Sequence, residues 1–210
     1  MLVDAESQAT HLEPALLRRI KQGALARSSG KPIYQVRCQQ EDLEDAAVIH
    51  HLYDAFAERL LFIGAQYPAN SDGEVFGECP QTKEDELAAF EKVVSQLPRA
   101  VPILHYSDAL PRWYSDKFDG SVDLEARFVD LARRVRGVAV YQGPVFGVAQ
   151  HAEYLLGVDP HREGHAEAAA MWASQEGGVD RLLSKGRADL SDLCGLVEAV
   201  LAEDLSGGLR

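Results

Sequence analysis

The sequence has no basic excess, little cysteine and no long apolar run, and each absence excludes a class of protein. Its 210 residues carry 21 Lys and Arg against 33 Asp and Glu, so no overall positive field attracts nucleic-acid phosphates. Cys38, Cys79 and Cys194 are too few and too far apart for a disulfide framework or a zinc site. No apolar run has membrane-spanning length, and the acidic N-terminus is unlike a signal peptide. We therefore expect a cytoplasmic protein without a membrane partner.

The hydrophobic period changes along the chain from that of strands to that of helices. An amphipathic helix is predicted over His11–Ala26, where Leu12, Leu16, Leu17, Ile20 and Leu25 are assigned to one apolar stripe. The predicted strands are Ile33–Val36, Val48–Tyr53, Leu60–Tyr67, Glu74–Glu78 and Val101–Tyr106. The predicted later helices are Thr82–Leu97, Val122–Arg136, Gly147–Leu156, Glu163–Gln175 and Ala188–Ala202. This order predicts an α/β protein with a mixed five-stranded sheet flanked by helices, with Val48–Tyr53 as the central strand.

The stretch Leu2-Val3-Asp4-Ala5-Glu6 has the form of a first catalytic strand in two-metal nucleases. There, an Asp and a Glu two residues apart point to one face of a strand and hold a divalent ion. In this chain a predicted helix follows at His11, and the predicted strand meander begins about forty residues later. We interpret Asp4 and Glu6 as an acidic terminus.

Several segments, taken in order, carry a family resemblance. They are Leu17–Val36, Leu60–Gly64, Glu84–Phe90, Leu104–Tyr106, Phe128–Leu131, His151–Gly157, Ala169–Trp172 and Ala188–Leu193. Together they resemble the RNase H-like domain of bacterial RecB-like predicted nucleases, which is of the DEDD exonuclease type. The resemblance implies an RNase H-like three-layer fold over residues 32–210, preceded by a helical connector over residues 1–31. It also implies two metal ions, Mg²⁺ or Mn²⁺, held by four acids: two on the first strand, one after the fourth and one on the last helix.

Both first-strand acids are missing from the matching stretch. The positions of the Asp and the Glu fall on His50 and Leu52 or, with a shift of one residue, on His51 and Tyr53. An imidazole is a softer ligand than Mg²⁺ prefers, so neither histidine replaces the missing carboxylates. The resemblance therefore implies a first strand that has lost its metal ligands.

The other acids are only partly retained. Leu110 stands where the acid after the fourth strand belongs, and Asp108 lies two residues away. The last helix keeps Asp189, with Lys185 at the position of a frequent family tyrosine. Asp130 matches a recurrent family aspartate that is usually structural. The residual catalytic candidates are thus Asp189, Asp108 and Asp130.

No metal or other cofactor is expected at this degenerate site. If a metal such as Mn²⁺ or Zn²⁺ does bind, the candidate ligands are Asp189, His50, His51 and Asp108. Without a metal, His50 or His51, together with Leu52 or Tyr53, should fill the space beside Asp189, and the Lys185 ammonium should pair with the Asp189 carboxylate.

Three interpretations of the function stay open. The preferred one is a catalytically degenerate nuclease fold that acts as a binding or scaffolding module, with a protein partner or nucleic acid. The second is an active metal-dependent 3'-5' exonuclease or related nuclease with an altered acid set, and the third is an unrelated α/β protein. Arg133, Arg134 and Arg136 form a local basic patch that could face phosphates, although a solvated helix face explains the same pattern.

Overall fold

The computed structural model describes most of the chain between residues 14 and 201. The described residues are 14–30, 33–34, 43, 45–70, 72–106, 109–117, 124, 127–140, 147–157, 169–170, 172–173 and 177–201. Asp4, Glu6, Cys38, Asp108 and the side chain of Arg136 lie outside this part, so the interpretations placed on them stay predictions.

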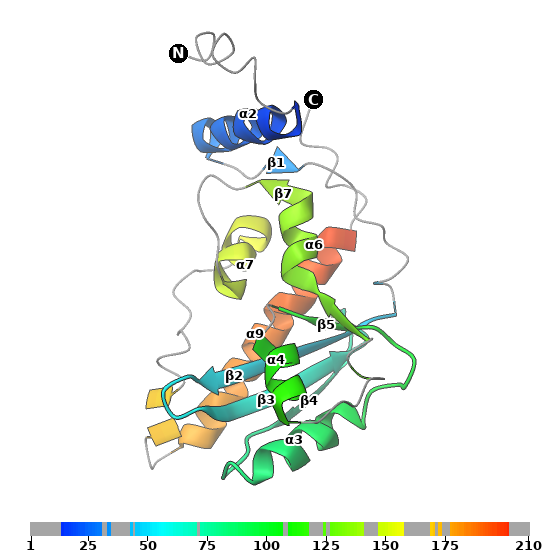
Figure 1. The fold of residues 1–210 in the computed structure, drawn as a ribbon, viewed down its shortest axis with the longest axis vertical. Helices are drawn as coiled ribbons and strands as arrows, with labels where there is room; N and C mark the ends of the chain where they lie inside the picture. Colours follow the sequence, from blue (N-terminus) through cyan, green and yellow to red (C-terminus); the bar gives the residue numbers. More distant parts are fainter. Residues whose placement is uncertain are drawn as a thin grey trace.

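A mixed five-stranded sheet lies at the centre of the fold (Figure 1). Its strands, in spatial order, are β4 (Glu74–Glu78), β3 (Arg59–Tyr67), β2 (Ala47–Asp54), β5 (Ile103–His105) and β6 (Phe128–Asp130). The first three form an antiparallel meander, and β5 and β6 run parallel to β2. The predicted sheet type and strand number are confirmed, and Val48–Tyr53 lies in the central strand as expected.

Two strand assignments made from the sequence are wrong. Phe128–Asp130 is the edge strand β6, although the pattern predicted a helix through it; the helix α6 begins only at Leu131 and ends at Val138. The predicted strand Ile33–Val36 does not belong to the main sheet. Its described part, β1 (Ile33–Tyr34), pairs antiparallel with β7 (Ala139–Val140) in a separate two-stranded sheet. A strand of two residues is too short to show the alternating hydrophobic pattern, and its partner strand lies more than a hundred residues away in the sequence. Neither feature could therefore indicate this pairing from the sequence.

Helices cover both faces of the main sheet, because side chains alternate along each strand. The first face packs against α9 (Gly178–Leu201) and α6, and α7 (Val148–Leu156) contacts α9. The second face packs against α3 (Asp85–Val94) and α4 (Ala109–Lys117). On β2, Val48 and Leu52 are buried against the first face, whereas Ala47 and Ile49 are buried against the second. Figure 1 shows α9 and α4 on opposite sides of the sheet.

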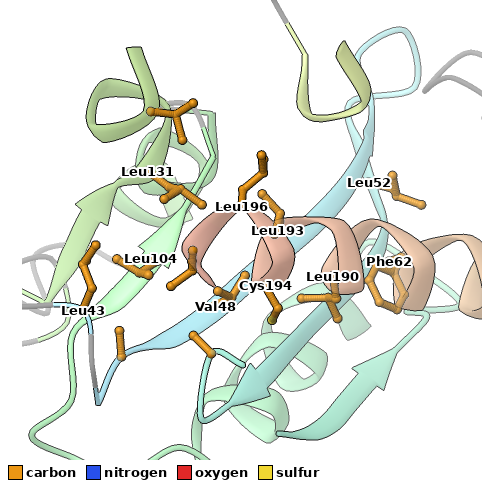
Figure 2. Close-up of a cluster of buried hydrophobic side chains, with 14 of the residues drawn as sticks. Leu43, Val48, Leu52, Phe62, Leu104, Leu131, Leu190, Leu193, Cys194 and Leu196 are labelled. Carbon is orange, nitrogen blue, oxygen red and sulfur yellow. The ribbon is translucent and has the colours of Figure 1, made fainter. Parts of the chain in front are cut away.

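The core of the α9 face holds one aromatic ring in a confined space. Figure 2 shows Leu190, Leu193 and Cys194 of α9 beside strand residues that include Val48 and Phe62. A Cβ added at Gly186 of α9 would lie 2.3 Å from the Phe62 ring, and one at Gly64 would lie 2.5 Å from it. A Cβ added at Gly77 of β4 would lie 2.9 Å from the same ring. Because these three positions are glycines, α9 can approach β3 and β4 with the Phe62 ring between them.

The N-terminal helix α2 (Pro14–Ser29) contacts the small β1–β7 sheet. Its Ala26 is buried, but Ile20 and Leu25 are about half exposed. The single apolar stripe assigned to this helix is therefore wrong for these two residues, which lie on different sides of the helix. No helix within the described ranges is long and apolar enough to cross a membrane.

Candidate functional site

Three side chains from the central strand and the last helix meet on the α9 face of the sheet. His50 Nε2 lies 3.1 Å from Asp189 Oδ2, and Lys185 Nζ donates to the same oxygen at 3.1 Å and to Asp189 Oδ1 at 3.4 Å. Their side chains are 8%, 14% and 11% exposed, in the order His50, Asp189 and Lys185. We call this group the His50–Asp189–Lys185 cluster.

The backbone brings the three residues together for simple geometric reasons. His50 lies two residues from Val48 and two from Leu52 along β2, so all three side chains point to the α9 face. Lys185 and Asp189 are four residues apart on α9 and therefore lie on one side of the helix, where side chains at i and i+4 are neighbours. Gly186, next to Lys185, lets this turn of the helix lie against the Phe62 ring.

Two opposing effects act on the Asp189 carboxyl group. Burial raises its pKa, while the hydrogen bond and charge of His50, and then the charge and hydrogen bond of Lys185, lower it. The two nitrogen partners prevail, so the pKa of Asp189 lies below its ordinary value. Asp189 is thus a buried carboxylate that stays ionised at neutral pH and carries the negative charge of the cluster.

Three of the other site positions predicted from the sequence lie elsewhere. Leu110 of α4, which stands where the acid after the fourth strand was expected, is fully buried in the core on the opposite face of the sheet, so this position does not face Asp189. The alternation along β2 also directs His51 to that opposite face, and Tyr53 packs there against the core. Leu52, by contrast, is buried on the α9 face, two residues from His50. The strand therefore presents His50 and Leu52, and not His51 and Tyr53, to α9.

Asp130 and the arginine patch belong to the start of α6. Asp130 Oδ1 accepts a hydrogen bond from the Arg133 backbone N–H at 3.2 Å, and Oδ2 lies 3.4 Å from Arg133 Nε. Accepting from the third residue of the helix is what an N-cap side chain does. Arg133 is largely exposed, Arg134 is half-buried, and both lie on the helix that Asp130 caps.

The sequence did not single out two polar residues that the structure buries on the α9 side. His151 of α7 is fully buried, with its ring 5.7 Å from the Tyr106 ring, and Tyr106 packs against the α9 core. Asp192 is buried one turn beyond Asp189 on α9. Their signal was present, because His151 and Asp192 lie inside two of the segments that carry the family resemblance.

The cluster offers one carboxylate, one imidazole and one ammonium. Two Mg²⁺ ions need several carboxylate oxygens to neutralise them, and an ammonium in contact with the carboxylate adds positive charge where a cation would bind. Within the described ranges, no group of three His, Cys, Asp or Glu side chains is arranged to hold a metal ion. These donors therefore do not fit the two-metal centre that the resemblance implies. Their chemistry is that of an ion pair extended by an imidazole.

No family model, curated protein or solved structure matches the chain.

Proposed function

We propose that the chain is a catalytically degenerate RNase H-like domain, in which a nuclease-type fold serves as a binding or scaffolding module in nucleic-acid metabolism. The His50–Asp189–Lys185 cluster carries this proposal. An RNase H-like fold has its first meander strand at the centre of the sheet and an acid on the last helix directed toward that strand. Here β2 is central, and Asp189 of α9 contacts it at His50.

The contacts of Asp189 support the loss of catalysis. Both partners of its Oδ2 are nitrogen groups, and Lys185 Nζ supplies a positive charge at the place where metal ions would otherwise neutralise the carboxylate. The position two residues along β2, which would carry the second acid, is the buried Leu52. The fold has kept its packing while the side chains needed for metal-dependent cleavage are absent from β2.

A cytoplasmic location is part of the proposal. Burial raises the pKa of Cys79 to about 11 and that of Cys194 to about 12, and both cysteines are free. Such thiols stay protonated and unreactive at neutral pH, which suits a protein of a reducing compartment.

The test is a nuclease assay of the purified chain with Mg²⁺ or Mn²⁺ on single-stranded DNA, duplex DNA and RNA. We expect background cleavage from the wild type and from Asp189→Asn, and no heat of Mg²⁺ or Mn²⁺ binding in calorimetry. Asp180→Asn is the matched control, because Asp180 is an exposed acid in the first turn of the same helix. Metal-dependent cleavage that Asp189→Asn abolishes and Asp180→Asn leaves intact would overturn the proposal.

A further inference from the structure

The hairpin between β2 and β3 holds an aromatic ring in solvent. Phe56, in the turn between the two strands, is fully exposed, while every other large apolar side chain described as exposed keeps about half or more of its surface covered. The turn lies at the left of Figure 1, at the end of the cyan strands. A fully exposed phenylalanine gains nothing for folding, since all of its apolar surface stays in water.

The turn that carries Phe56 is fixed from its entry side. Asp54 Oδ1 accepts hydrogen bonds from the backbone N–H groups of Phe56 at 2.9 Å and Ala57 at 3.1 Å. This is an Asx-type turn, in which a side chain replaces a backbone acceptor. Glu58 ends the turn in the left-handed region with a φ of 49°, a conformation that a residue with a Cβ adopts at a cost and keeps only where its surroundings impose it.

The exit side of the hairpin is anchored by Arg59. Its Nη2 donates to the carbonyl oxygens of Pro80, at 3.2 Å, and Gln81. Its Cζ lies 4.3 Å from the centre of the Trp172 ring, a cation–π distance. The next residue, Leu60, donates its backbone N–H to the buried Glu86 carboxylate at 2.9 Å. The tip is therefore pre-organised, and an aromatic side chain on a pre-organised turn loses little conformational entropy on binding.

The charge around the tip is negative. Asp54 and Glu58 lie on either side of Phe56 in the turn. Burial, and then the negative charges of Glu86, Glu58, Asp116 and Asp54, raise the pKa of Tyr53, the residue before Asp54. Of the bases nearby, Lys117 is paired with Glu86 at 3.4 Å, and Arg59 is held by the contacts above.

We propose that the β2–β3 hairpin tip, residues 54–58, is a docking site for a protein partner that offers an apolar pocket bordered by Arg or Lys side chains. Phe56 enters the pocket, and Asp54 and Glu58 face the basic border. Nucleic acid does not suit this surface, since the same acids repel phosphates. A second copy of this chain does not suit it either, because each copy carries a net charge of -12. The inference rests on the proposed role as a binding module and names the chemistry of its partner.

The probe is a synthetic amphipathic Leu/Arg peptide, titrated into the ¹⁵N-labelled full chain and followed by NMR. A Leu/Glu peptide of the same pattern and an oligoarginine of equal charge are the comparison probes. We expect the Leu/Arg peptide to shift the amide signals of residues 54–59 and to bind at least about tenfold more tightly than either comparison probe. Phe56→Ala should weaken this binding about tenfold without changing the melting temperature, because its ring contributes no buried area.

Leu87→Ala is the matched control, since Leu87 is an exposed apolar residue of α3 outside the hairpin, and it should bind the peptide as the wild type does. Equal binding by Phe56→Ala and wild type would overturn the proposal, as would oligoarginine binding as tight as that of the Leu/Arg peptide, or no binding by any peptide. A single-stranded oligonucleotide that shifts the same amides, or self-association lost in Phe56→Ala, would overturn it in favour of nucleic acid or a second copy. Metal-dependent cleavage in the nuclease assay would overturn the degenerate-domain proposal and leave this result unchanged.

Discussion

Asp189 is the residue on which the cluster depends, since its Oδ2 is the shared acceptor of an imidazole and an ammonium. Both nitrogen groups are almost wholly buried, so neither exchanges its partner for water without moving. A buried charge that loses its partner destabilises a protein far more than an exposed one does. The carboxylate therefore has a structural role that can be measured separately from any catalytic one.

The first prediction concerns Asp189→Asn. The amide can still hydrogen-bond to His50, but it leaves the Lys185 ammonium buried without a counter-charge, so the free energy of unfolding should fall by about 1–3 kcal/mol. Urea unfolding at pH 7 measures it. The double variant Lys185→Met with Asp189→Asn should recover most of the loss, because the amide still pairs with His50 and no ammonium is left buried. An unchanged stability in Asp189→Asn would remove the ion-pair interpretation.

The second prediction concerns pH. Because the folded-state pKa of Asp189 is lowered, its ionisation stabilises the fold above the unfolded-state pKa, about 3.9, and this contribution is lost as the pH falls through the folded value. The stability difference between wild type and Asp189→Asn should therefore shrink as the pH falls below about 4. Urea unfolding of both proteins at several pH values below about 5 tests this, and a difference that grows as the pH falls through this range would contradict it.

At the scale of elements, the position of α9 against the sheet depends on the Phe62 ring and the glycines around it. On the sheet side, the ring occupies space that a Cβ at Gly64 or Gly77 would otherwise take. The helix turn that contacts it is also the turn that carries Lys185, and Asp189 follows one turn later. The packing of one ring and the geometry of the cluster are thus linked through Gly186.

The third prediction is that Gly186→Ala destabilises the fold although alanine is the better helix former. The added Cβ would lie 2.3–2.6 Å from Phe62 ring atoms, and overpacking of this kind costs about 1–3 kcal/mol. Gly23→Ala in α2 is the control, because a Cβ there meets nothing within 4 Å and should be neutral or slightly stabilising. Thermal unfolding compares the two, and equal effects of both substitutions would contradict the packing argument.

The fourth prediction separates the two roles suggested for Asp130. As the N-cap of α6, it should be replaceable by Ser, whereas Asp130→Ala should cost about 1 kcal/mol of unfolding free energy. Chemical denaturation of both variants measures this. Were Asp130→Ser as destabilised as Asp130→Ala, the capping role would be wrong.

The strand meander could be predicted from the sequence because its signals are local, whereas the meeting of Asp189, Lys185 and a histidine of β2 was expected only from the family resemblance. Val48–Tyr53 and Leu60–Tyr67 are long runs of β-forming residues. The last helix was predicted only from Ala188, but α9 begins at Gly178, and this longer helix places Lys185 and Asp189 on one side. β6 was missed because its three residues run directly into α6, whose apolar period continues through Leu131 and Val135. The position of Leu110 was missed because the direction in which α4 leaves the sheet is set by packing against α3 and the second face, which no local pattern records.

At the scale of the whole molecule, the net charge limits what the fold can bind. With a charge of -12 and Arg133 paired to Asp130, the arginine patch on α6 has little positive charge to offer phosphates. An α/β protein of this charge is better suited to a basic protein partner than to a nucleic acid.

The fifth prediction follows from that charge. A fluorescent single-stranded 20-mer should show no anisotropy change with the chain below about 100 μM at physiological salt, which is at the weak end of non-specific binding. Arg133→Glu should leave this result unchanged. Micromolar binding by the wild type that Arg133→Glu removes would show that the patch contacts nucleic acid.

The helix α9 follows every strand in the sequence, and this order affects how the chain folds during synthesis. The strands β2 to β6 leave the ribosome first, and the apolar face that includes Val48, Leu52 and Leu104 has its main cover only when α9 follows. Until then the nascent chain exposes one apolar face of the sheet. Chaperones bind surfaces of this kind, and without chaperones such surfaces tend to aggregate. Docking of α9 closes that surface and completes the cluster in the same step.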